Sequence, residues 1–365
     1  MRIVFLQSSL WLSGGARVII EHCNLLAKRG HQVSIVIPKD AIDPEMASEI
    51  SDQVTICQAA YPLIKPLSLW DKLRLTSAMV AVVPKCDVLV ATHTPTTLIS
   101  LLAGRMLRKG IPVWFYMDYP GMFEERPSEA WLLEHAMTWH RGAVVLSCYS
   151  EQELRRISHC DVRFIGNAIS HYPVFSSFRQ YSRRKGSKKQ IMYLGDFRPR
   201  KGLADFLKAV EIVYQSLPGI ELLIVLKEDG EIATSVPFHK VLRPGLSELA
   251  ECYAGSDVFV SASWHEGFGM PPLEAMACGT PVVLTDSGGV RDYSRPGENC
   301  LMVPPMKHKE LAAAIQQLLL DPALVEKFRQ NGPLTAQEYT WDKVADRMEN
   351  ALMDFINQPP FRAAQ

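Results

Sequence analysis

Residues 263–283 read SWHEGFGMPPLEAMACGTPVV, and the glycines and prolines of this stretch predict a loop, a short helix and a strand in succession. The loop precedes Pro271 and Pro272, because neither glycine nor proline extends a helix that arrives from the N-terminal side. Proline suits the first turn of a new helix, since its missing N–H would be unpaired there in any case. We therefore predict a helix over 272–277, ended by Gly279, and a buried strand over 281–285.

Two glutamates frame the junction of this loop and helix. Glu266 lies on the predicted loop, and Glu274, eight positions later, lies in the first turn of the predicted helix. The first N–H groups of a helix have no partner within it and lie at the positive end of the helix dipole, so they attract anions. We predict a phosphate site formed by Gly269, Met270, Pro271 and Leu273.

The chemistry of a carboxylate beside a phosphate predicts a role for each glutamate. Such a carboxylate is repelled unless it binds another group, and the vicinal hydroxyls of a ribose are donors that it accepts well. We therefore expect Glu274 to bind a ribose and Glu266 to face a transferred sugar, where it would stabilise positive charge at the anomeric carbon. The alternative is that both are solvated surface glutamates, and the surrounding glycines and prolines argue against it.

Strand-like and helix-like segments alternate along the whole chain. Short β-branched runs separate segments of helical periodicity, which is typical of a parallel sheet with helices on both faces. The alternation occurs in two rounds, so we predict an α/β protein of two doubly wound domains. The predicted segments are 2–7, 15–28, 33–37, 73–82, 87–92, 96–107, 112–117, 129–140 and 143–147 in the first round, then 191–195, 203–214, 220–226, 239–242, 246–253, 257–263, 272–277, 281–285, 307–320 and 324–338 in the second.

The break between the two rounds sets the predicted domain boundaries. Residues 170–189 are polar and basic and lack periodicity, so we predict a linker between a first domain over 1–169 and a second over 190–340. The C-terminal segment 341–365, amphipathic as far as Ile356, is expected to pack back on the first domain. Ligands of doubly wound sheets bind beyond the carboxyl ends of the strands, so we expect the site in the cleft between the domains.

The composition excludes several classes of protein. Of the 365 residues, 39 are Lys or Arg and 39 are Asp or Glu, so no overall basic field indicates nucleic acid as a partner. The eight cysteines have no CxxC pair and no zinc-like spacing, which indicates a reducing compartment. No apolar run is long enough to span a bilayer, and residues 2–7 are interpreted as a first strand rather than a signal peptide. We expect a cytoplasmic protein.

The basic residues of the predicted linker have two interpretations. They form either a soluble tether or a surface that rests on anionic lipid head groups near a membrane-bound acceptor. The second interpretation would make the protein peripheral to the inner face of the membrane. The residues concerned are Arg183, Arg184, Lys185, Lys188 and Lys189.

The stretch from Glu266 to Val283 resembles the signature of the retaining GT-B glycosyltransferases of family 4, and the two-domain layout resembles theirs over nearly the whole chain. The resemblance implies transfer of a sugar from a nucleoside diphosphate sugar to a glycan, a lipid-linked or another hydroxyl acceptor, as in polysaccharide biosynthesis. It also implies that Glu266 contacts the donor sugar and that Glu274 contacts the nucleotide ribose. Members of the family retain the anomeric configuration, and the departing diphosphate helps to deprotonate the acceptor.

Other glycine-containing stretches match the same family less closely. Gly14 and Gly15, in LSGGAR, correspond to glycines that lie against the donor diphosphate or the acceptor, although they are equally typical of a plain tight turn. FIGNAI, with Asn167, resembles the stretch before the family's linker. DSGGVRDY, with Gly288 and Gly289, resembles its later nucleotide-side loop.

The cations of GDFRPRKG, residues 195–202, resemble the family's diphosphate clamp with one departure. Lys201 matches the family lysine, but Asp196 stands where the family usually has an arginine. Either Arg198 or Arg200 compensates, or the donor phosphate is held more weakly. We predict Lys201 and Arg200 as phosphate ligands.

A second departure lies in VWFYMDYPGMF, residues 113–123. Asp118 is expected at the cleft end of a strand, and many family members have a histidine just before this aspartate, whereas Met117 stands there in this chain. Methionine neither donates nor accepts hydrogen bonds strongly. Another residue must then handle the acceptor proton, and the candidates are Asp118 and His93, unless His93 is only a structural histidine at a strand end.

These inferences predict a retaining hexosyl-type glycosyltransferase with Glu266, Asp118 and Lys201 as catalytic residues. No metal-binding DxD motif stands out, and the N–H groups near residues 270–273 together with Lys201 would stabilise the leaving group. We therefore expect a metal-independent enzyme without a cofactor. Two alternatives stay open: a nucleotide-sugar epimerase or hydrolase on the same fold, and a degenerate partner subunit, which the departures at Met117 and Asp196 keep open.

Overall fold

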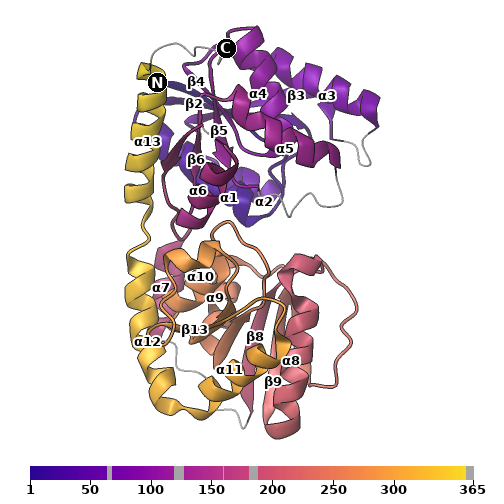
Figure 1. Ribbon diagram of the computed structural model, residues 1–365, viewed down its shortest axis with the longest axis vertical. Helices are drawn as coiled ribbons and strands as arrows, with labels where there is room; N and C mark the ends of the chain where they lie inside the picture. Colours follow the sequence, from indigo (N-terminus) through magenta and orange to yellow (C-terminus); the bar gives the residue numbers. More distant parts are fainter. Residues whose placement is uncertain (64–67, 119–126, 159, 181–187, 359–365) are drawn as a thin grey trace. The chain divides into compact units, whose positions relative to one another are not determined.

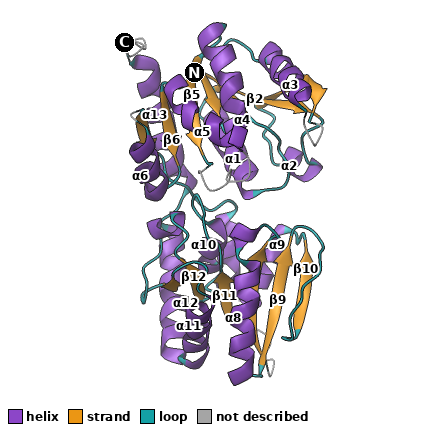
Figure 2. Cartoon of the chain, turned by 45° about the vertical axis from the view of Figure 1, so that its right-hand side comes forward, coloured by secondary structure: helices purple, strands orange, loops and turns teal. Residues whose placement is uncertain are grey.

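The computed structural model describes residues 1–63, 68–118, 127–158, 160–180 and 188–358 (Figure 1). The chain divides into two compact units, of which the first contains residues 1–170 and the segment from Trp341 onward, and the second contains residues 171–340. In each unit, helices cover both faces of a parallel sheet (Figure 2). The predicted α/β class is therefore confirmed.

A seven-stranded parallel sheet in the order β3-β2-β1-β4-β5-β6-β7 forms the first unit. The strand order reverses at β1, which pairs with β2 on one side and with β4 on the other. Doubly wound sheets bind ligands at such a reversal, beyond the carboxyl ends of the strands. The strands are β1 (Arg2–Leu6), β2 (Gln32–Lys39), β3 (Val54–Pro62), β4 (Val88–Ala91), β5 (Ile111–Tyr116), β6 (Gly142–Val145) and β7 (Asp161–Phe164).

The helices of the first unit follow the predicted segments with two kinds of difference. A single helix over 96–107 is predicted, but α4 ends at Ser100 and continues as a π-helix over Leu101–Met106. The strands β3 and β7 and the helices α2 and α6 are absent from the prediction. β3 is an edge strand whose buried positions form no continuous apolar run. The helices are α1 (Gly14–Lys28), α2 (Pro44–Ser48), α3 (Leu69–Val82), α4 (Thr94–Ser100), α5 (Pro127–Trp139), α6 (Cys148–Ile157) and α13 (Trp341–Asn357).

A six-stranded parallel sheet in the order β10-β9-β8-β11-β12-β13 forms the second unit. Its order reverses at β8, which pairs with β9 and with β11. The strands are β8 (Lys189–Gly195), β9 (Ile220–Leu226), β10 (Phe238–Leu242), β11 (Val258–Ser261), β12 (Val282–Thr285) and β13 (Cys300–Val303). The α-helices are α7 (Tyr172–Ser177), α8 (Leu203–Ser216), α9 (Leu246–Gly255), α10 (Met270–Ala277), α11 (His308–Leu320) and α12 (Pro322–Gln337).

The segment 170–189, predicted as a linker, begins with a helix in the structure. α7 packs against α9 and α10, and a short 3₁₀ turn over Phe178–Gln180 follows it. Phe175 is buried, and its ring lies edge-on to that of Tyr253, with 6.0 Å between the ring centres. This apolar contact attaches α7 to the second unit, whereas the polar pattern around it predicted only a tether. Residues 181–187, with Arg183, Arg184 and Lys185, lie outside the described residues.

The C-terminal helix α13 packs on the first unit against α1, β5 and β6. Its apolar face includes Leu352 and Phe355, which join the same buried cluster as Phe5 and Phe115 of the central strands. Because burial of large apolar side chains is the main favourable term in such packing, this face holds α13 in the first unit.

His22, on the buried face of α1, is a polar residue in an apolar environment. Its ring centre lies 5.1 Å from that of Phe115 and 5.3 Å from that of Trp341. Among the described residues, neither ring nitrogen of His22 has a hydrogen-bond partner. Burial lowers the pKa of His22 to about 3, so the imidazole is neutral at pH 7.

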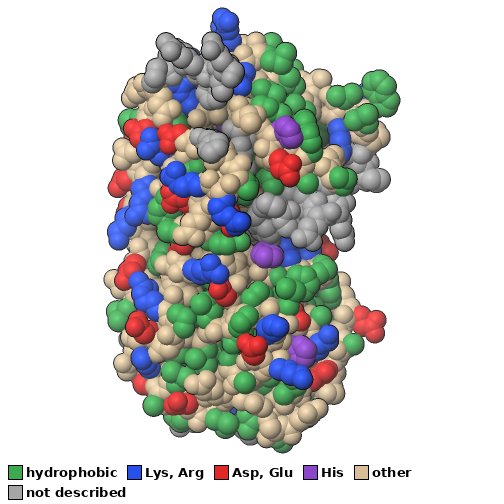
Figure 3. All heavy atoms as spheres, in the orientation of Figure 1, with side chains coloured by type: hydrophobic (Ala, Val, Ile, Leu, Met, Phe, Trp, Pro, Cys, Tyr) green, Lys and Arg blue, Asp and Glu red, His purple; other side chains and the backbone are tan. Residues whose placement is uncertain are grey.

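The surface carries both positive and negative side chains, in agreement with the balanced charge of the sequence. Lysine and arginine side chains lie interspersed with aspartate and glutamate on the face shown in Figure 3. The partly exposed ion pairs of the described residues include Arg155–Glu151 and Arg291–Asp286. All eight cysteines lie among the described residues, and none of them forms a disulfide. The described helices include none that is long and apolar enough to cross a bilayer.

We expect His22→Leu to stabilise the first unit by about 1–2 kcal/mol at pH 7, because it removes an unpaired polar group from an apolar core. The gain should grow in acid. Since the folded pKa of His22 lies below the unfolded value of 6.5, the unfolded state binds the proton first, and the wild type loses about 1.4 kcal/mol per pH unit as the pH falls from 6.5 towards 3. Hydrogen exchange of the β1 and β5 amides at pH 7 and pH 5 measures both effects.

His140→Leu is the matched control, because His140 is also buried but its ring nitrogens lie 2.6 Å from Ala136 O and 3.2 Å from Ser100 Oγ. This variant should destabilise the unit at pH 7, since it leaves those two oxygens without their partner. Equal destabilisation by the two substitutions would show that the unpaired ring nitrogens of His22 do not lower the stability of the first unit.

Candidate active site

Three loops meet beyond the carboxyl ends of β8, β11 and β12, which are neighbouring strands of the second sheet. They carry residues 196–202 after β8, residues 262–269 after β11 and residues 286–288 after β12. Because the strand order reverses at β8, this is the edge at which doubly wound sheets bind ligands.

Backbone contacts hold the first two loops against each other. The Trp264 N–H donates a hydrogen bond to Arg200 O at 2.7 Å. Gly202 has a φ of 69°, and a Cβ at this position would lie only 1.9 Å from Ala262 O. Any side chain would therefore force the two loops apart, so only glycine fits.

The third loop is tied to the second at Glu266. The Glu266 N–H donates to Ser287 O at 2.8 Å, and the Gly289 N–H donates to Glu266 O at 3.0 Å. These bonds form a short bridge between the two loops. They fix the backbone of Glu266, so the direction in which its side chain leaves the loop is determined by the sheet.

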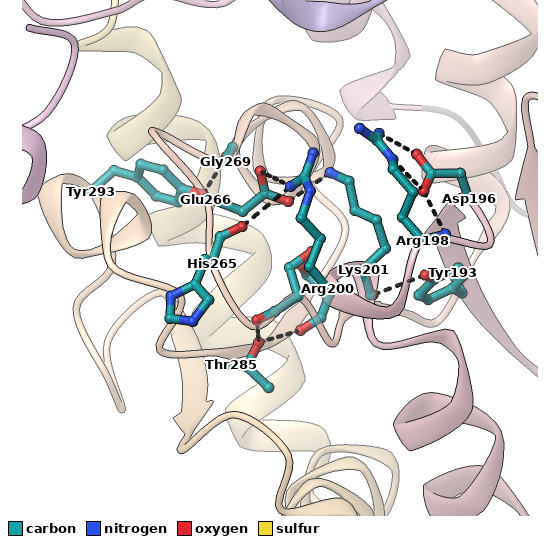
Figure 4. A network of polar contacts seen from close by, with 12 residues as sticks. Tyr193, Asp196, Arg198, Arg200, Lys201, His265, Glu266, Gly269, Thr285 and Tyr293 are labelled. Atoms are coloured by element: carbon teal, nitrogen blue, oxygen red, sulfur yellow. Dashed lines mark hydrogen bonds and ion pairs between the residues drawn. The ribbon is translucent and has the colours of Figure 1, made fainter. Parts of the chain in front are cut away.

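An ion pair joins the first two loops at their centre. Lys201 Nζ lies 2.7 Å from Glu266 Oε1, and Arg200 Nη1 lies 3.9 Å from Glu266 Oε2. Figure 4 shows both cations directed toward this carboxylate. The side chains of Lys201 and Glu266 are only 17% and 15% exposed. Burial would raise the pKa of Glu266, but Lys201 and Arg200 outweigh it and hold the pKa below its usual value, so the carboxylate is ionised at neutral pH.

The two arginines of the first loop have different partners. Arg198 donates to Asp196, with Nε 2.9 Å from Oδ1 and Nη2 in contact with Oδ2, and Figure 4 shows its guanidinium beside Asp196. Arg200 instead lies beside Lys201 and Glu266. Its side chain is 21% exposed, against 54% for Arg198. Of the two arginines that could compensate for Asp196, Arg200 is the one placed at the ion pair.

Lys227, immediately after β9, adds to the positive charge of this edge. Burial lowers its pKa, and repulsion from Arg198, Lys201 and Arg200 lowers the pKa further, against the opposing attraction of Asp196. Cations that repel one another in a partly buried region favour the binding of a multiply charged anion.

α10 starts at Met270, after Gly269 with a φ of 82°, and not at residue 272 as predicted. Pro271 and Pro272 have no N–H, so Met270 is the only one of the first three residues that can donate from the backbone. The predicted phosphate site around residues 269–273 therefore offers fewer backbone donors than most helix N-termini, and the nearby side-chain cations must carry more of the charge.

Glu274 lies in the second turn of α10, and the prediction of a first-turn position is wrong because the helix starts at Met270. Tyr253 Oη donates to Glu274 Oε2 at 3.0 Å, and Tyr253 is fully buried on α9. This hydrogen bond fixes the direction of the carboxylate. The sequence contains no signal for it, since the two residues are 21 positions apart and meet only because α9 packs on α10.

In the first unit, Gly14 and Gly15 are the first residues of α1. Ser13 caps this helix, and its Oγ accepts a hydrogen bond from the Ala16 N–H at 3.1 Å. A Cβ on Gly14 would meet no atom within 4 Å, and one on Gly15 would lie 4.0 Å from Met117 Cε. The glycines therefore leave the helix N-terminus open, with Met117 beside it.

Asp118 follows β5 at the same edge of the first sheet and is only 5% exposed. Its Oδ2 accepts hydrogen bonds from the N–H and the hydroxyl of Thr94, at 2.6 and 2.7 Å, and His93 Nδ1 lies 3.4 Å from its Oδ1. Burial would raise the pKa of Asp118, but the hydrogen bonds from His93 and Thr94 hold the pKa below its usual value. The predicted catalytic carboxylate is thus ionised and bound to the first turn of α4.

The described residues contain no group of three or more His, Cys, Asp or Glu side chains that could hold a metal ion. Metal independence itself stays a prediction, because a substrate phosphate can supply ligands that the protein lacks.

Comparison with known proteins assigns most of the chain to two family profiles. Residues 12–171 match "Glycosyltransferase Family 4", and residues 174–335 match "Glycosyl transferases group 1". A protein of Rhodococcus opacus named D-inositol 3-phosphate glycosyltransferase is 34% identical over 138 residues, which is 38% of this chain and 30% of that protein. Curated relatives of this kind are matched over less than half of their own length.

Solved structures share this fold over nearly the whole chain. Sucrose-phosphate synthase from Thermosynechococcus elongatus has a TM-score of 0.80 at 21% identity, covering 97% of this chain and 99% of that one. The Anabaena protein HepE in complex with UDP-glucose has a TM-score of 0.76 at 17% identity, covering 97% and 100%. At these identities the likeness shows the fold, which is the predicted GT-B fold.

We expect Lys201→Met to lower the free energy of unfolding of the second unit by about 3 kcal/mol at pH 7, because the buried, ionised Glu266 loses its nearest cation and keeps only the more distant Arg200 as a charged partner. Since the folded pKa of Glu266 is depressed, the pair stabilises the unit above the usual glutamate pKa and loses this effect as the pH falls below it. The difference between variant and wild type should therefore shrink in acid. Urea unfolding at pH 7 and pH 4 measures this difference.

The double variant Lys201→Met/Glu266→Gln is the control for this experiment. It leaves no charge unpaired, so it should recover part of the lost stability. A double variant no more stable than Lys201→Met alone would contradict the role of the ion pair.

Proposed function

The chain belongs to the group 1 glycosyl transferases of family 4, and on this premise we propose that it transfers a sugar from a nucleoside diphosphate sugar to a hydroxyl acceptor with retention of anomeric configuration. The observation that carries the proposal is the cluster of Arg200 and Lys201 around Glu266 at the reversal point of the second sheet. Lys227 adds a further positive charge nearby.

The charge of this edge supports a diphosphate as the anchoring group of the donor. Lys201 and Arg200 provide charge-assisted hydrogen bonds to phosphate oxygens, and the N-terminus of α10 adds a weaker attraction through its dipole. Glu266 balances part of this positive charge before the donor binds. A dianionic or trianionic group would then replace the carboxylate as the main partner of Lys201.

The two glutamates are proposed to bind the neutral parts of the donor. Glu274, held by Tyr253, accepts the hydroxyls of the nucleotide ribose. Glu266, freed from part of its ion pair by the diphosphate, accepts hydroxyls of the transferred sugar and stabilises the positive charge that develops at the anomeric carbon.

In the proposed reaction, the bond between the anomeric carbon and the donor β-phosphate oxygen breaks while the acceptor oxygen bonds to the same face of that carbon. The proton of the acceptor hydroxyl passes to the departing diphosphate, so no external base, metal or redox partner is required. Lys201 and Arg200 stabilise the negative charge of the leaving group, which is the charge that grows most in the transition state.

The substrates are proposed by class. UDP is the first nucleotide to test, because HepE, which shares this fold, has been solved with UDP-glucose. A glycan or lipid-linked acceptor follows from the family resemblance, and the name of the Rhodococcus relative adds a phosphorylated polyol to the acceptors worth testing. The cytoplasmic location and the lipid contact of the basic segment stay predictions.

A thermal-shift panel of UDP, GDP, ADP, CDP and dTDP, without metal and then with Mg²⁺, tests donor binding. A ligand that binds only the folded state stabilises it by roughly 2.7 kcal/mol at a hundredfold excess over its dissociation constant. We expect a clear shift for one nucleotide without metal. A shift that appears only with Mg²⁺ would contradict metal independence, and no shift with any nucleotide would favour a degenerate subunit.

Substitution of Glu266 separates a transferase from a protein that only binds nucleotide. Glu266→Ala should retain the nucleotide-dependent thermal shift but lose most of the sugar transfer, measured as release of the nucleoside diphosphate from the sugar donor with an acceptor panel. Glu248→Gln, on the exposed face of α9, is the control. Nucleotide release that needs no acceptor and yields free sugar would instead indicate a hydrolase.

We expect Arg200→Ala to raise the dissociation constant of the preferred nucleoside diphosphate about tenfold, because it removes a charge-assisted hydrogen bond from a largely buried site. Arg198→Ala should change the dissociation constant less than about threefold, since Arg198 is half-exposed and bound to Asp196. Isothermal titration of both variants makes the comparison. The reverse order of effects would assign the compensating role to Arg198.

A further inference from the structure

His93 and Asp118 form a side-chain pair at the carboxyl edge of the first sheet. His93 lies just after β4 and Asp118 just after β5, and these strands are paired neighbours with Ala91 opposite Trp114. β4 pairs with β5 on one side and with β1 on the other. The open N-terminus of α1, which follows β1 in the chain, therefore lies at the same edge. The pair therefore lies where the order of the first sheet reverses, at the position that binds ligands in doubly wound sheets.

The carboxylate of Asp118 is occupied on both oxygens. Oδ2 accepts two hydrogen bonds from Thr94, and Oδ1 faces His93 Nδ1 at 3.4 Å. Asp118 is 5% exposed, whereas His93 is 27% exposed. A buried carboxylate with these partners is placed to orient other groups, and His93 is the member of the pair that reaches solvent.

The orientation of His93 determines what its ring can offer. Asp118 is ionised and can only accept, so the ring nitrogen that faces it, Nδ1, carries the proton. In the neutral ring, Nε2 is then an acceptor. Within the described part of the chain, Nε2 has no hydrogen-bond partner. The backbone of His93 is held separately, through hydrogen bonds with Thr96 Oγ1 at 3.2 and 2.7 Å.

We propose that His93 Nε2 accepts a hydrogen bond from a substrate hydroxyl and that Asp118 is the positioning residue that orients the ring. The inference rests on the proposed function, because it names a second contact of the same reaction. It assigns to His93 a polar role that Met117 cannot perform, since the Met117 side chain lies beside Gly15 and has no strong donor or acceptor. The hydroxyl belongs to the donor sugar or to the acceptor.

The orientation of the ring is tested first, without substrate. A ¹H–¹⁵N correlation spectrum of the histidine rings should show His93 Nε2 as the unprotonated nitrogen in the wild type. Asp118→Asn should move the ring to a mixture of tautomers, because the amide no longer requires a proton on Nδ1. A wild-type ring already protonated on Nε2 would overturn the inference, whatever the activity of the variants.

Kinetics test the contact with substrate. His93→Ala should lower kcat/KM for transfer about tenfold, the loss of one neutral hydrogen bond, while the dissociation constant of the nucleoside diphosphate stays within twofold. His93→Gln, whose side chain reaches the place of Nε2 with a polar group, should recover part of the loss.

His135→Ala, on α5 of the same unit, is the control, because the Nδ1 of His135 lies 2.8 Å from Trp131 O within its own helix. The melting temperature of His93→Ala should fall only slightly, since Asp118 keeps both hydrogen bonds from Thr94 and the ring makes none of the backbone bonds of residue 93.

Two further arms identify the hydroxyl and separate this inference from the proposed function. In His93→Ala, the rate at which water hydrolyses the sugar donor is compared with the rate of transfer. If both rates fall, the hydroxyl is on the donor sugar, and if only transfer falls, it is on the acceptor. Wild-type kcat/KM in His93→Ala would overturn the inference and leave the proposed function intact. A wild-type protein that neither binds a nucleoside diphosphate nor releases one from a sugar donor would overturn the proposed function instead.

Discussion

The ion pair between Lys201 and Glu266 is the interaction on which the candidate site of the second unit depends. Both side chains are largely buried, and a buried charge is tolerated only beside an opposite one. The pair therefore requires the loops after β8 and β11 to stay in contact, which the Trp264–Arg200 hydrogen bond and the lack of a side chain at Gly202 make possible. Glu266 therefore balances only part of the positive charge at this sheet edge, because Arg200 and Lys227 lie there as well.

The first unit uses the same physical principle with different groups. A buried anion, Asp118, follows a central strand and is satisfied by the start of a helix and by a histidine. In both units a carboxylate beyond a strand end fixes the side chains and loops around it, because an ionised group in a poorly solvated place must collect donors. The partners differ: cations surround Glu266 in the second unit, whereas Thr94 and an imidazole surround Asp118 in the first.

The two departures from the family pattern have different structural outcomes. At Asp196 the missing arginine is replaced by an acid that binds Arg198, while Arg200 takes the place next to the ion pair. At Met117 the missing histidine leaves a side chain beside the N-terminus of α1, and the imidazole of His93, from the neighbouring strand end, lies 3.4 Å from Asp118.

Local patterns determined much of this protein. The alternation of strands and helices, the turn from loop to helix at Pro271 and the placement of Glu266 on that loop all follow from backbone preferences and periodicity, which act over a few residues. Edge strand β3 and helix α7 escaped prediction because Phe175 and the few buried residues of β3 give no periodic signal. Contacts between distant segments were decided only by the tertiary structure: Lys201 with Glu266, Tyr253 with Glu274, and His93 with Asp118. Each joins residues from separate strands or helices, and such partners are chosen by how the sheet orders its strands, which no local pattern encodes.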